Sequence, residues 1–473
     1  MSRFNLVVHS GWLFAAAFTA SALSQGCSDS EADATLPPPP SPTEDAGVDA
    51  AASDATTEDS GGPAPASFSG EVTCGASGPC VVGIAANAGH HICALLADKT
   101  VRCWGQNDRG QLGVAPTESE EPGDLAHSPK PVRPDELSNV TQISVNGSAG
   151  GTSCARVEDG RALCWGSNST GQLGLDANAV IRDADAHPMP TAVEGVPYAS
   201  RIDLASGFAC AVGRLGEGDT EGDGGGLSCW GANDVLQLGR GHLPIAWGAA
   251  GAVDLRFRKV LRAAGTSRVG FAVRDTGQLL SWGGNEWQNQ SFVGVVNLRD
   301  ALGRESSFSP DPVPYELPVI GDVTDLAAST KHACIVAGGA VHCWGMNDTG
   351  AVGNSSRVDD RWPFEVTVQG ARPIRNLSVS DKTTCAASID GKAYCWGDNT
   401  KGQLGAGNAD FTFEPMSVSG LGGRVVRLAT MDETTCALIE DGTVECWGSN
   451  ARGQLGIGTR DDDEHFQPTK VVF

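Results

Sequence analysis

Basic residues are scarce in this chain of 473 residues. It holds 33 Lys and Arg against 57 Asp and Glu, which gives a formal net charge of −24. Proteins bind a nucleic-acid backbone through a basic stripe, so this excess of acidic residues argues against such a partner. Beyond the N-terminal segment, the sequence also lacks an apolar run long enough to span a bilayer and an apolar pattern of helical period.

Motifs for metal binding and nucleophilic catalysis are missing as well. No C-x-x-C pair or Cys/His cluster has metal-ligand spacing, and the Asp-Gly pairs lack the spacing of calcium loops. The nine histidines accompany no serine or cysteine nucleophile motif. We interpret the acidic runs at 217–223 and 461–464 as solvated charge rather than cation sites. The sequence therefore predicts no metal, no cofactor and no catalytic residue.

What the sequence does contain is one repeated stretch, seen most fully at residues 446–456 (CWGSNARGQLG). Its tryptophan recurs with spacings of 61, 65, 52, 62, 52 and 51 residues. Each unit holds four short runs of strand character joined by tight turns, and proline occurs in the last run, as an outermost edge strand tolerates. We expect these tryptophans to pack blade against blade; they are Trp104, Trp165, Trp230, Trp282, Trp344, Trp396 and Trp447.

Cysteine spacing predicts disulfides within the hairpins. If Cys154 faces Cys164 across a hairpin, a three-residue turn ending in Gly160 remains, and this is a favoured turn of that length. Directly opposed residues lie within disulfide reach. Buried free thiols or metal ligands are the rival interpretation. In the fourth copy both cysteines are replaced together, by Phe271 and Ser281. The predicted pairs are Cys74–Cys80, Cys93–Cys103, Cys154–Cys164, Cys210–Cys229, Cys334–Cys343, Cys385–Cys395 and Cys436–Cys446.

The N-terminal segment predicts export. Residues 1–26 carry a positive start and an apolar run, and they end just before Cys27 in a sequence that resembles the lipobox of bacterial lipoproteins, with Ser24 where leucine is usual. A secretory signal without lipidation and a plain membrane anchor are the alternatives. Residues 27–67 are acidic and proline-rich, so we expect a disordered tether. Residues 68–473 form the repeat domain.

The repeated unit resembles that of the regulator of chromosome condensation family. The likeness covers residues 84–473 in seven copies, of which the fourth is the weakest. It implies an all-β fold: a seven-bladed β-propeller with four antiparallel strands in each blade. The paired cysteines are additional to the family pattern. The C-terminal residues 466–473 resemble 413–418, and a different lead-in precedes the first copy, so we expect the terminal strand to complete the first blade.

Binding residues are expected where the repeat is interrupted, because loops on a rigid scaffold usually carry function. The fourth copy shows no Gln-Leu-Gly and is flanked by the longest insertions. The sequence therefore suggests residues 240–318 as the main contact surface. The alternative is that these long loops form a satellite hydrophobic cluster that binds no partner. Aromatic and arginine side chains dominate binding hot spots. The candidate binding residues are Trp247, Arg256, Arg258, Trp287 and Trp362.

Together these features predict an exported, lipid-anchored scaffold that binds an unknown protein or glycan at the cell surface. Its expected location is the cell envelope, as an outer-membrane or surface lipoprotein, with secretion as the alternative. We expect a monomer that contacts no nucleic acid. The rival functions are an envelope carbohydrate-active enzyme and an enzyme inhibitor like the secreted propellers that cap β-lactamases. Guanine-nucleotide exchange, implied by family analogy, conflicts with export and with the acidic surface.

Overall fold

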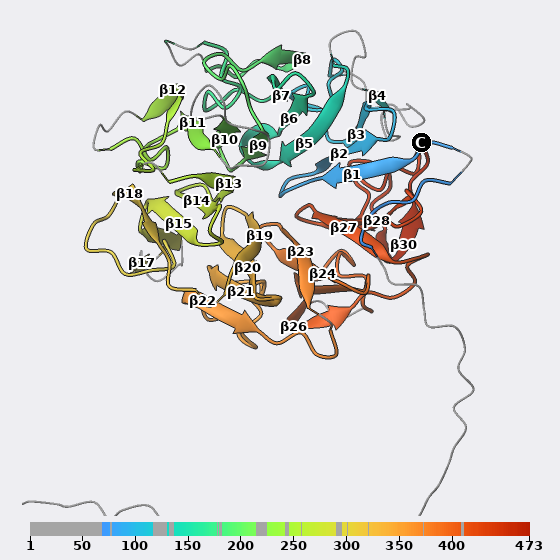
Figure 1. Cartoon of the computed structure of the whole chain (residues 1–473). Helices are drawn as coiled ribbons and strands as arrows, with labels where there is room; N and C mark the ends of the chain where they lie inside the picture. Colours follow the sequence, from blue (N-terminus) through green and yellow to red (C-terminus); the bar gives the residue numbers. More distant parts are fainter. Residues whose placement is uncertain are drawn as a thin grey trace, which may run out of the picture. The chain divides into compact units, whose positions relative to one another are not determined.

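Seven four-stranded antiparallel sheets form the folded part of the chain in this computed structural model (Figure 1). The described residues belong to one compact unit, Ala66–Phe473. Met1–Pro65 forms a separate unit outside them, so the predicted signal peptide, Cys27 and the tether are not described. The structure describes residues 69–75, 78–116, 130–131, 137–176, 178, 182–213, 225–241, 246–256, 258–289, 296–299, 301–319, 321–371, 373–407 and 411–473.

Each repeat supplies the four strands of one blade in chain order, as the seven-bladed propeller predicts. The first strands, which surround the central axis in Figure 1, are β1 (Val81–Ala85), β5 (Val140–Asn146), β9 (Arg201–Leu204), β13 (Val260–Gly265), β19 (Val323–Ala328), β23 (Ile374–Val379) and β27 (Val425–Thr430). The second strands are β2 (His91–Leu96), β6 (Thr152–Val157), β10 (Phe208–Gly213), β14 (Val269–Arg274), β20 (His332–Ala337), β24 (Thr383–Ser388) and β28 (Thr434–Ile439).

The third and fourth strands continue each blade outward to the rim. The third strands are β3 (Val101–Gly105), β7 (Ala162–Gly166), β11 (Gly226–Ala232), β15 (Leu279–Gly283), β21 (Ala340–Gly345), β25 (Ala393–Asp398) and β29 (Val444–Ser449). The fourth strands are β4 (Lys130–Pro131), β8 (His187–Ala192), β12 (Trp247–Ala252), β18 (Asp311–Glu316), β22 (Asp360–Val366), β26 (Phe411–Ser417) and β30 (Glu464–Lys470). A separate hairpin, β16 (Glu286–Asn289) and β17 (Val296–Arg299), lies within the fourth repeat.

The second and third strands of each blade have the register that the cysteine spacing predicts. Cys154 lies opposite Cys164 with 4.1 Å between their α-carbons. The turn between them ends on Gly160 at φ 88°, and the first hairpin places Lys99 at φ 66° in the equivalent position. Phe271 and Ser281 are opposed in the same way without a bond. The described residues contain the disulfides Cys74–Cys80, Cys93–Cys103, Cys154–Cys164, Cys210–Cys229, Cys334–Cys343, Cys385–Cys395 and Cys436–Cys446.

The repeat tryptophans pack between blades, as the sequence predicts. The Trp165 Nε1 donates a hydrogen bond of 2.9 Å to the Gln111 carbonyl of the preceding blade, and five further tryptophans make the equivalent bond. Trp344 is the exception, because its buried Nε1 has no hydrogen-bond partner among the described residues. In six repeats the glycine of the Leu-Gly or Val-Gly pair lies beneath the next tryptophan: a Cβ on Gly174 would lie 2.9 Å from Trp230 Nε1. These contacts repeat around the ring.

Ring closure differs from the expectation, because the terminal strand does not complete the first blade. β30 pairs with β29 of its own blade, and β4 supplies the fourth strand of the first blade. The seventh blade instead packs against the first. Trp104 Nε1 donates to the Gln454 carbonyl at 2.9 Å, and the Phe473 ring meets the Trp104 ring edge-on at 5.8 Å. Side-chain packing and backbone hydrogen bonds between these two blades therefore close the ring, and β30 stays in its own blade.

The fourth repeat also keeps more of its loop than the sequence suggests. Leu302 and Gly303 take the places of the Leu-Gly pair, and Gly303 lies beneath Trp344 like its equivalents in other blades. The interpretation that this copy had lost its loop motif is therefore wrong for the Leu-Gly part. Residues 286–301, which include β16 and β17, separate Leu302 from Asn285 and so hide the motif from a search by spacing.

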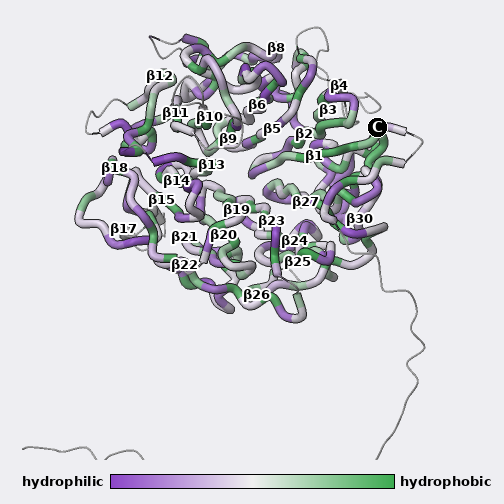
Figure 2. Tube along the Cα trace, viewed as in Figure 1, coloured by the Kyte–Doolittle hydropathy of each residue, from purple (hydrophilic) through white to green (hydrophobic). Residues whose placement is uncertain are grey.

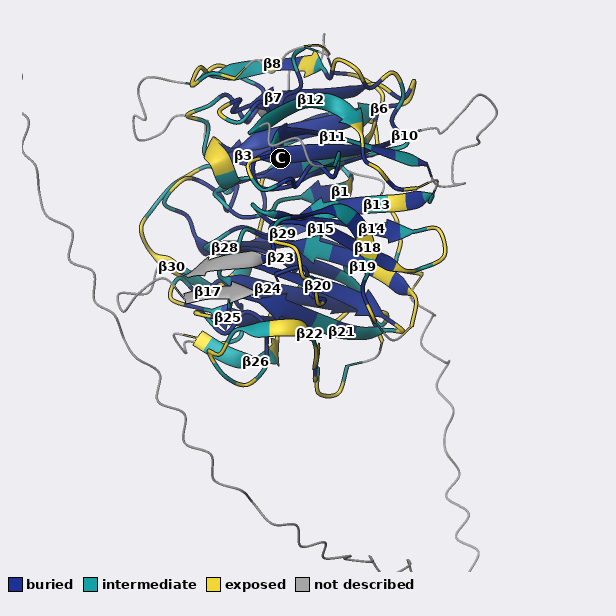
Figure 3. Ribbon diagram, turned by 90° about the vertical axis from the view of Figure 1, so that its left-hand side faces the viewer, coloured by how far each residue is buried: buried dark blue, intermediate teal, exposed yellow. Residues whose placement is uncertain are grey.

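Burial follows the radial order of the strands. The middle strands of the blades are almost wholly buried, while exposed residues gather on outer strands such as β22 and β26 (Figure 3). Each hydrophobic cluster joins two neighbouring blades; one, for example, joins Val101 of the first with Val145 of the second. In the described part of the chain, no helix is long and apolar enough to cross a membrane.

Candidate functional site

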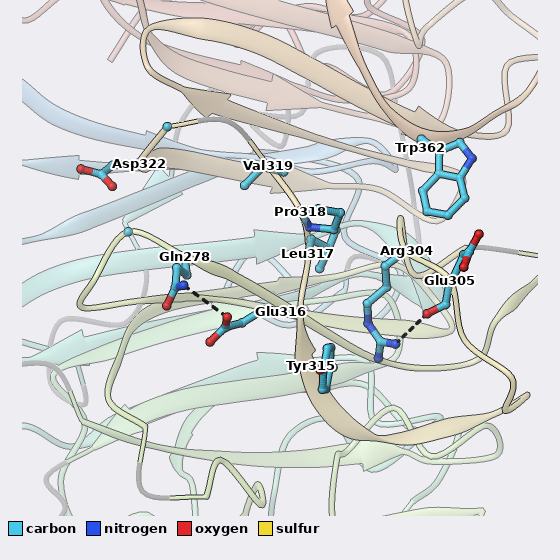
Figure 4. A pocket seen from close by; sticks show the side chains of 12 residues that line it. Gln278, Arg304, Glu305, Tyr315, Glu316, Leu317, Pro318, Val319, Asp322 and Trp362 are labelled. Atoms are coloured by element: carbon cyan, nitrogen blue, oxygen red, sulfur yellow. Dashed lines mark hydrogen bonds between the residues drawn. The ribbon is translucent and has the colours of Figure 1, made fainter.

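A cavity lined by exposed aromatic side chains lies at the rim between the fourth and fifth blades. Its volume is about 640 Å³, and its walls come mainly from β18 and the loop that follows it, while β22 contributes Trp362 (Figure 4). The side chains and backbone that line it belong to Gly277, Gln278, Arg304, Glu305, Tyr315, Glu316, Leu317, Pro318, Val319, Gly321, Asp322 and Trp362.

Two aromatic side chains are the most exposed apolar groups of this cavity. Tyr315 is 57% exposed and Trp362 is 41% exposed. The sequence Asp311-Pro312-Val313-Pro314-Tyr315 explains the position of the tyrosine, because prolines are tolerated on an edge strand where no neighbouring strand requires the N–H group. Rings of this kind bury a large contact area at little entropic cost, so the cavity is suited to binding.

A buried arginine supports the tyrosine from below. The Arg304 Cζ lies 5.4 Å from the centre of the Tyr315 ring, in the range of a cation–π contact. The Arg304 Nη2 forms an ion pair of 3.0 Å with Asp311, and its Nε donates to Ser281 Oγ at 3.1 Å. Because the side chain of Arg304 is only 6% exposed, these contacts fix its position rather than offer its charge to solvent.

The remaining polar groups give the cavity an acidic edge. Glu316 accepts hydrogen bonds from Arg274 at 2.8 Å and from Gln278 at 3.2 Å, and Figure 4 shows the latter contact. Glu305 and Asp322 are exposed. The described residues hold no group of three or more His, Cys, Asp or Glu that could bind a metal ion. The arrangement is suited to recognition through aromatic faces and carboxylates.

The structure separates the binding residues that the sequence suggests. Trp362 lines the rim cavity, whereas Trp247 on β12 stacks against Arg182, whose Cζ lies 3.7 Å from the ring centre. Arg256 and Arg258 line another cavity of about 470 Å³ beside Tyr198. Trp287 belongs to β16, but its side chain lies outside the described residues.

One contact still connects the separated residues, because Arg258 Nη1 donates to the Pro314 carbonyl of β18 at 3.4 Å. The sequence reasoning missed Tyr315, Arg304 and Glu316. The edge prolines around Tyr315 were an available signal for the tyrosine. Arg304 follows directly after Gly303, so finding it required the displaced Leu-Gly pair.

Family comparison supports the fold and the repeats. The model of the regulator of chromosome condensation (RCC1) repeat matches residues 390–438 and 441–473, and a second model of the same repeat matches 81–111, 140–172 and 374–403. These matched segments of the chain are RCC1 repeats. The chain's solved RCC1-type neighbours include Prp20p of Saccharomyces cerevisiae, at a TM-score of 0.62 and 16% identity over 84% of this chain and 88% of that one. Human WBSCR16 matches at 0.62 and 18% identity over 79% of this chain and 95% of that one. At such identities the likeness shows the fold alone.

Two relatives extend the comparison of this RCC1 propeller by sequence. The ultraviolet-B receptor UVR8 of Arabidopsis thaliana is 27% identical over 79% of this chain and 78% of its own length. The human E3 ubiquitin-protein ligase HERC2 is 25% identical over 76% of this chain, but the match spans only 7% of the ligase. The RCC1 propeller thus occurs in proteins of different activity, so the fold alone does not determine the function.

Proposed function

We propose that this protein is an exported, lipid-anchored propeller that binds another macromolecule, a protein or glycan, at the cell envelope. The observation that carries the proposal is the rim cavity, where Tyr315 and Trp362 stay exposed and the fixed guanidinium of Arg304 lies against the Tyr315 ring. Large exposed rings beside a cavity are the usual anchors of a binding hot spot. The structure of Prp20p is described together with its binding to Gsp1p and histones, which supports protein binding by propellers of this type.

Separate features support the proposed cellular location. The seven disulfides indicate an oxidising compartment. The apolar segment 1–26, Cys27 and the acidic residues 28–67 support lipid attachment followed by a tether. Replacing Cys27 with Ser should move the protein from the membrane fraction to the soluble fraction. Mature protein that keeps residues 1–26 would contradict the anchor without affecting the binding proposal.

The binding proposal is tested with full-length protein and cell-surface extract. Tyr315→Ala and Trp362→Ala should each weaken capture of the recovered partner by about tenfold, while the melting temperature stays unchanged. Phe411→Ala is the matched control, because Phe411 is also 41% exposed but lies on β26 outside the cavity. A glycan-binding and glycan-cleavage screen run in parallel distinguishes a sugar ligand or substrate from a protein.

A third set of variants tests the wider surface at 240–318. Trp247→Ala, Trp287→Ala and Arg258→Ala report on the parts of that segment outside the rim cavity. Loss of binding in these variants, with Tyr315→Ala and Trp362→Ala unchanged, would move the contact away from the cavity. Unchanged binding in all five variants would place it elsewhere on the ring.

A further inference from the structure

Seven equivalent residues surround the central channel of the propeller. Each lies on the first strand of its blade. The residue two places further along that strand pairs with the first cysteine of the hairpin, or with Phe271 in the fourth blade. All seven line one cavity of about 330 Å³. In blade order they are Gly83, Gln142, Arg201, Arg262, Asp325, Asn376 and Arg427. We refer to them as the channel ring; hydrophilic segments of β13 and β23 beside the axis are visible in Figure 2.

Most members of the channel ring bond to the next blade. Gln142 donates through Nε2 to the Ile202 carbonyl at 2.6 Å and accepts from the Ile202 N–H at 2.9 Å. Asn376 accepts from the Leu428 N–H at 3.0 Å. These amide side chains therefore act as clamps between the first strands of neighbouring blades, and their hydrogen-bonding groups are in use.

Both carboxylates that line the channel are also engaged. Asp203 accepts hydrogen bonds from Arg201 at 2.8 Å and from the Ala263 N–H at 3.0 Å. Asp325 forms an ion pair with Arg262 and accepts from the Leu377 N–H at 2.7 Å. Two guanidinium groups of the channel ring are thus neutralised by two carboxylates.

Arg427 is the member that remains. Its side chain is exposed to the water of the channel, and within the described part of the chain it forms no hydrogen bond and no ion pair. The next position of the channel ring, on β1, is Gly83, which has no side chain to meet it. A second donor belongs to the lining of the same cavity, because the buried Nε of Arg262 has no hydrogen-bond partner among the described residues.

The electrostatic surroundings of Arg427 favour a negative ligand. Crowding by protein atoms lowers the pKa of Arg427, and the positive charges of Arg201, Arg262 and Arg375 add to this effect against the attraction of Asp325. Neighbouring cations therefore raise the free energy of the charged form of Arg427. An anion in the channel would relieve that cost. The contrast with the net charge of −24 for the whole chain shows that this positive region is local.

We propose that the central channel binds a small oxyanion, with Arg427 as its principal ligand and the free Nε of Arg262 as a second donor. The planar fork of a guanidinium matches two oxygens of a phosphate, sulfate or carboxylate group. Where the first strands end, the Asn87 side chain crosses the channel and donates to the Ala328 carbonyl at 2.7 Å. The ligand therefore enters from the other end of the channel, where the first strands begin. The site is independent of the rim cavity.

The test measures binding of inorganic phosphate to the full-length protein by calorimetry at constant ionic strength. The wild-type protein should bind one phosphate saturably. Arg427→Gln should bind it at least about tenfold more weakly. Glutamine occupies the same position of the channel ring in the second blade, at Gln142, so this variant is compatible with the fold. Arg424→Gln is the matched control, because Arg424 lies on the surface in an ion pair with Glu440 and should leave phosphate binding unchanged.

Sulfate and acetate titrations separate the possible sources of the oxyanion. Competition of sulfate with phosphate indicates a tetrahedral ligand, whereas acetate binding that is tighter than phosphate binding indicates a carboxylate. Either result supports the site if the Arg427→Gln variant no longer binds the anion. Arg427→Lys, which keeps the charge but not the fork, should also bind more weakly than the wild type. Saturable binding that is equal in wild-type protein and in Arg427→Gln would overturn the proposal. So would the absence of saturable binding for all three anions.

Discussion

The Arg304 guanidinium donates to the Ser281 hydroxyl at 3.1 Å, at a position that holds cysteine in the other six repeats. The opposing cysteine position holds Phe271, whose ring meets Trp344 edge-on at 5.4 Å. The two replacements therefore have separate roles. Phe271 fills the contact between two blades, and Ser281 orients the arginine that lies beneath Tyr315. The blade without the disulfide is the blade that contributes most of the rim cavity.

Arg304→Ala is expected to destabilise the protein by about 3 kcal/mol, because it leaves the buried carboxylate of Asp311 without its ion-pair partner. Arg424→Ala removes a partly exposed arginine from an ion pair with Glu440 and should cost less than about 1 kcal/mol. Urea unfolding of both variants measures the difference. Equal costs would show that the Arg304–Asp311 pair contributes no more than a surface pair.

Local spacing accounts for what the sequence could predict. The cysteine spacing fixed the hairpin register, and the recurrence of Trp165 and its equivalents indicated blade packing, because these features depend on residues close in the chain. Arg304 could not be found in this way, since residues 286–301 separate it from the rest of its repeat. The channel ring depends on all seven repeats together. Its predicted anion site arises from differences between equivalent positions, such as Gly83 beside Arg427.

Ring closure was predicted wrongly for a related reason. Residues 466–473 resemble the last strand of the preceding repeat, and this likeness is the same whether β30 completes the seventh blade or the first. Sequence similarity identifies a fourth strand but not the sheet to which it adds. The pairing of β30 with β29 settles this point, and the contact between Trp104 and Gln454 shows how the ring closes instead.

Gly456→Ala tests that closure. A Cβ at Gly456 would lie 2.9 Å from Trp104 Nε1, and the residue has φ 65°, so both overlap and backbone strain oppose a side chain. We expect a loss of about 2–4 kcal/mol in unfolding free energy. Gly370→Ala is the matched control, with φ 68° but nothing within 4 Å of the added Cβ, and should cost about 1 kcal/mol. Equal losses of unfolding free energy in the two variants would mean that backbone strain alone, without overlap with Trp104, disfavours a side chain at position 456.

The hairpin disulfides should contribute modestly and independently. Cys154 and Cys164 close a loop of sequence separation 10, for which the chain-entropy estimate is about 2.5–3 kcal/mol. The tight turn at Gly160 already restricts the unfolded chain, so Cys154→Ala/Cys164→Ala should cost no more than about 2 kcal/mol. Peptide mapping without reduction should recover pairs within blades. Pairs between different blades would contradict the register.

A buried histidine gives the last prediction, which concerns pH. His332 lies in β20, and its Nε2 is 2.7 Å from Thr384 Oγ1 of the next blade. Burial, together with the positive charge of Lys331, lowers the pKa of His332 to about 4. Between pH 4 and 6.5 the unfolded chain therefore binds a proton that the folded chain excludes. This contribution to stability is complete above pH 6.5 and decreases as the pH falls toward 4.

Other buried groups modify this dependence. His91 behaves in the same sense, because burial and the neighbouring His90 lower its pKa to about 3. Asp432 acts in the opposite sense: burial and Asp381 raise its pKa to about 6, so its contribution to stability falls as the pH rises from about 4 to 6. A variant that replaces only His332 keeps His91 and Asp432. Their contributions to the unfolding free energy therefore cancel when this variant is compared with the wild-type protein.

His332→Thr is the suitable variant, since threonine occupies the equivalent positions Thr152, Thr383 and Thr434. Thr384 keeps its own bond to the Ala351 carbonyl at 2.8 Å, so no new unsatisfied group arises there. The loss of unfolding free energy between pH 7 and pH 5 should be about 2 kcal/mol smaller in His332→Thr than in the wild type. Urea unfolding at the two pH values measures it. An equal loss in both proteins would show that His332 is not the group whose protonation opposes folding in acid.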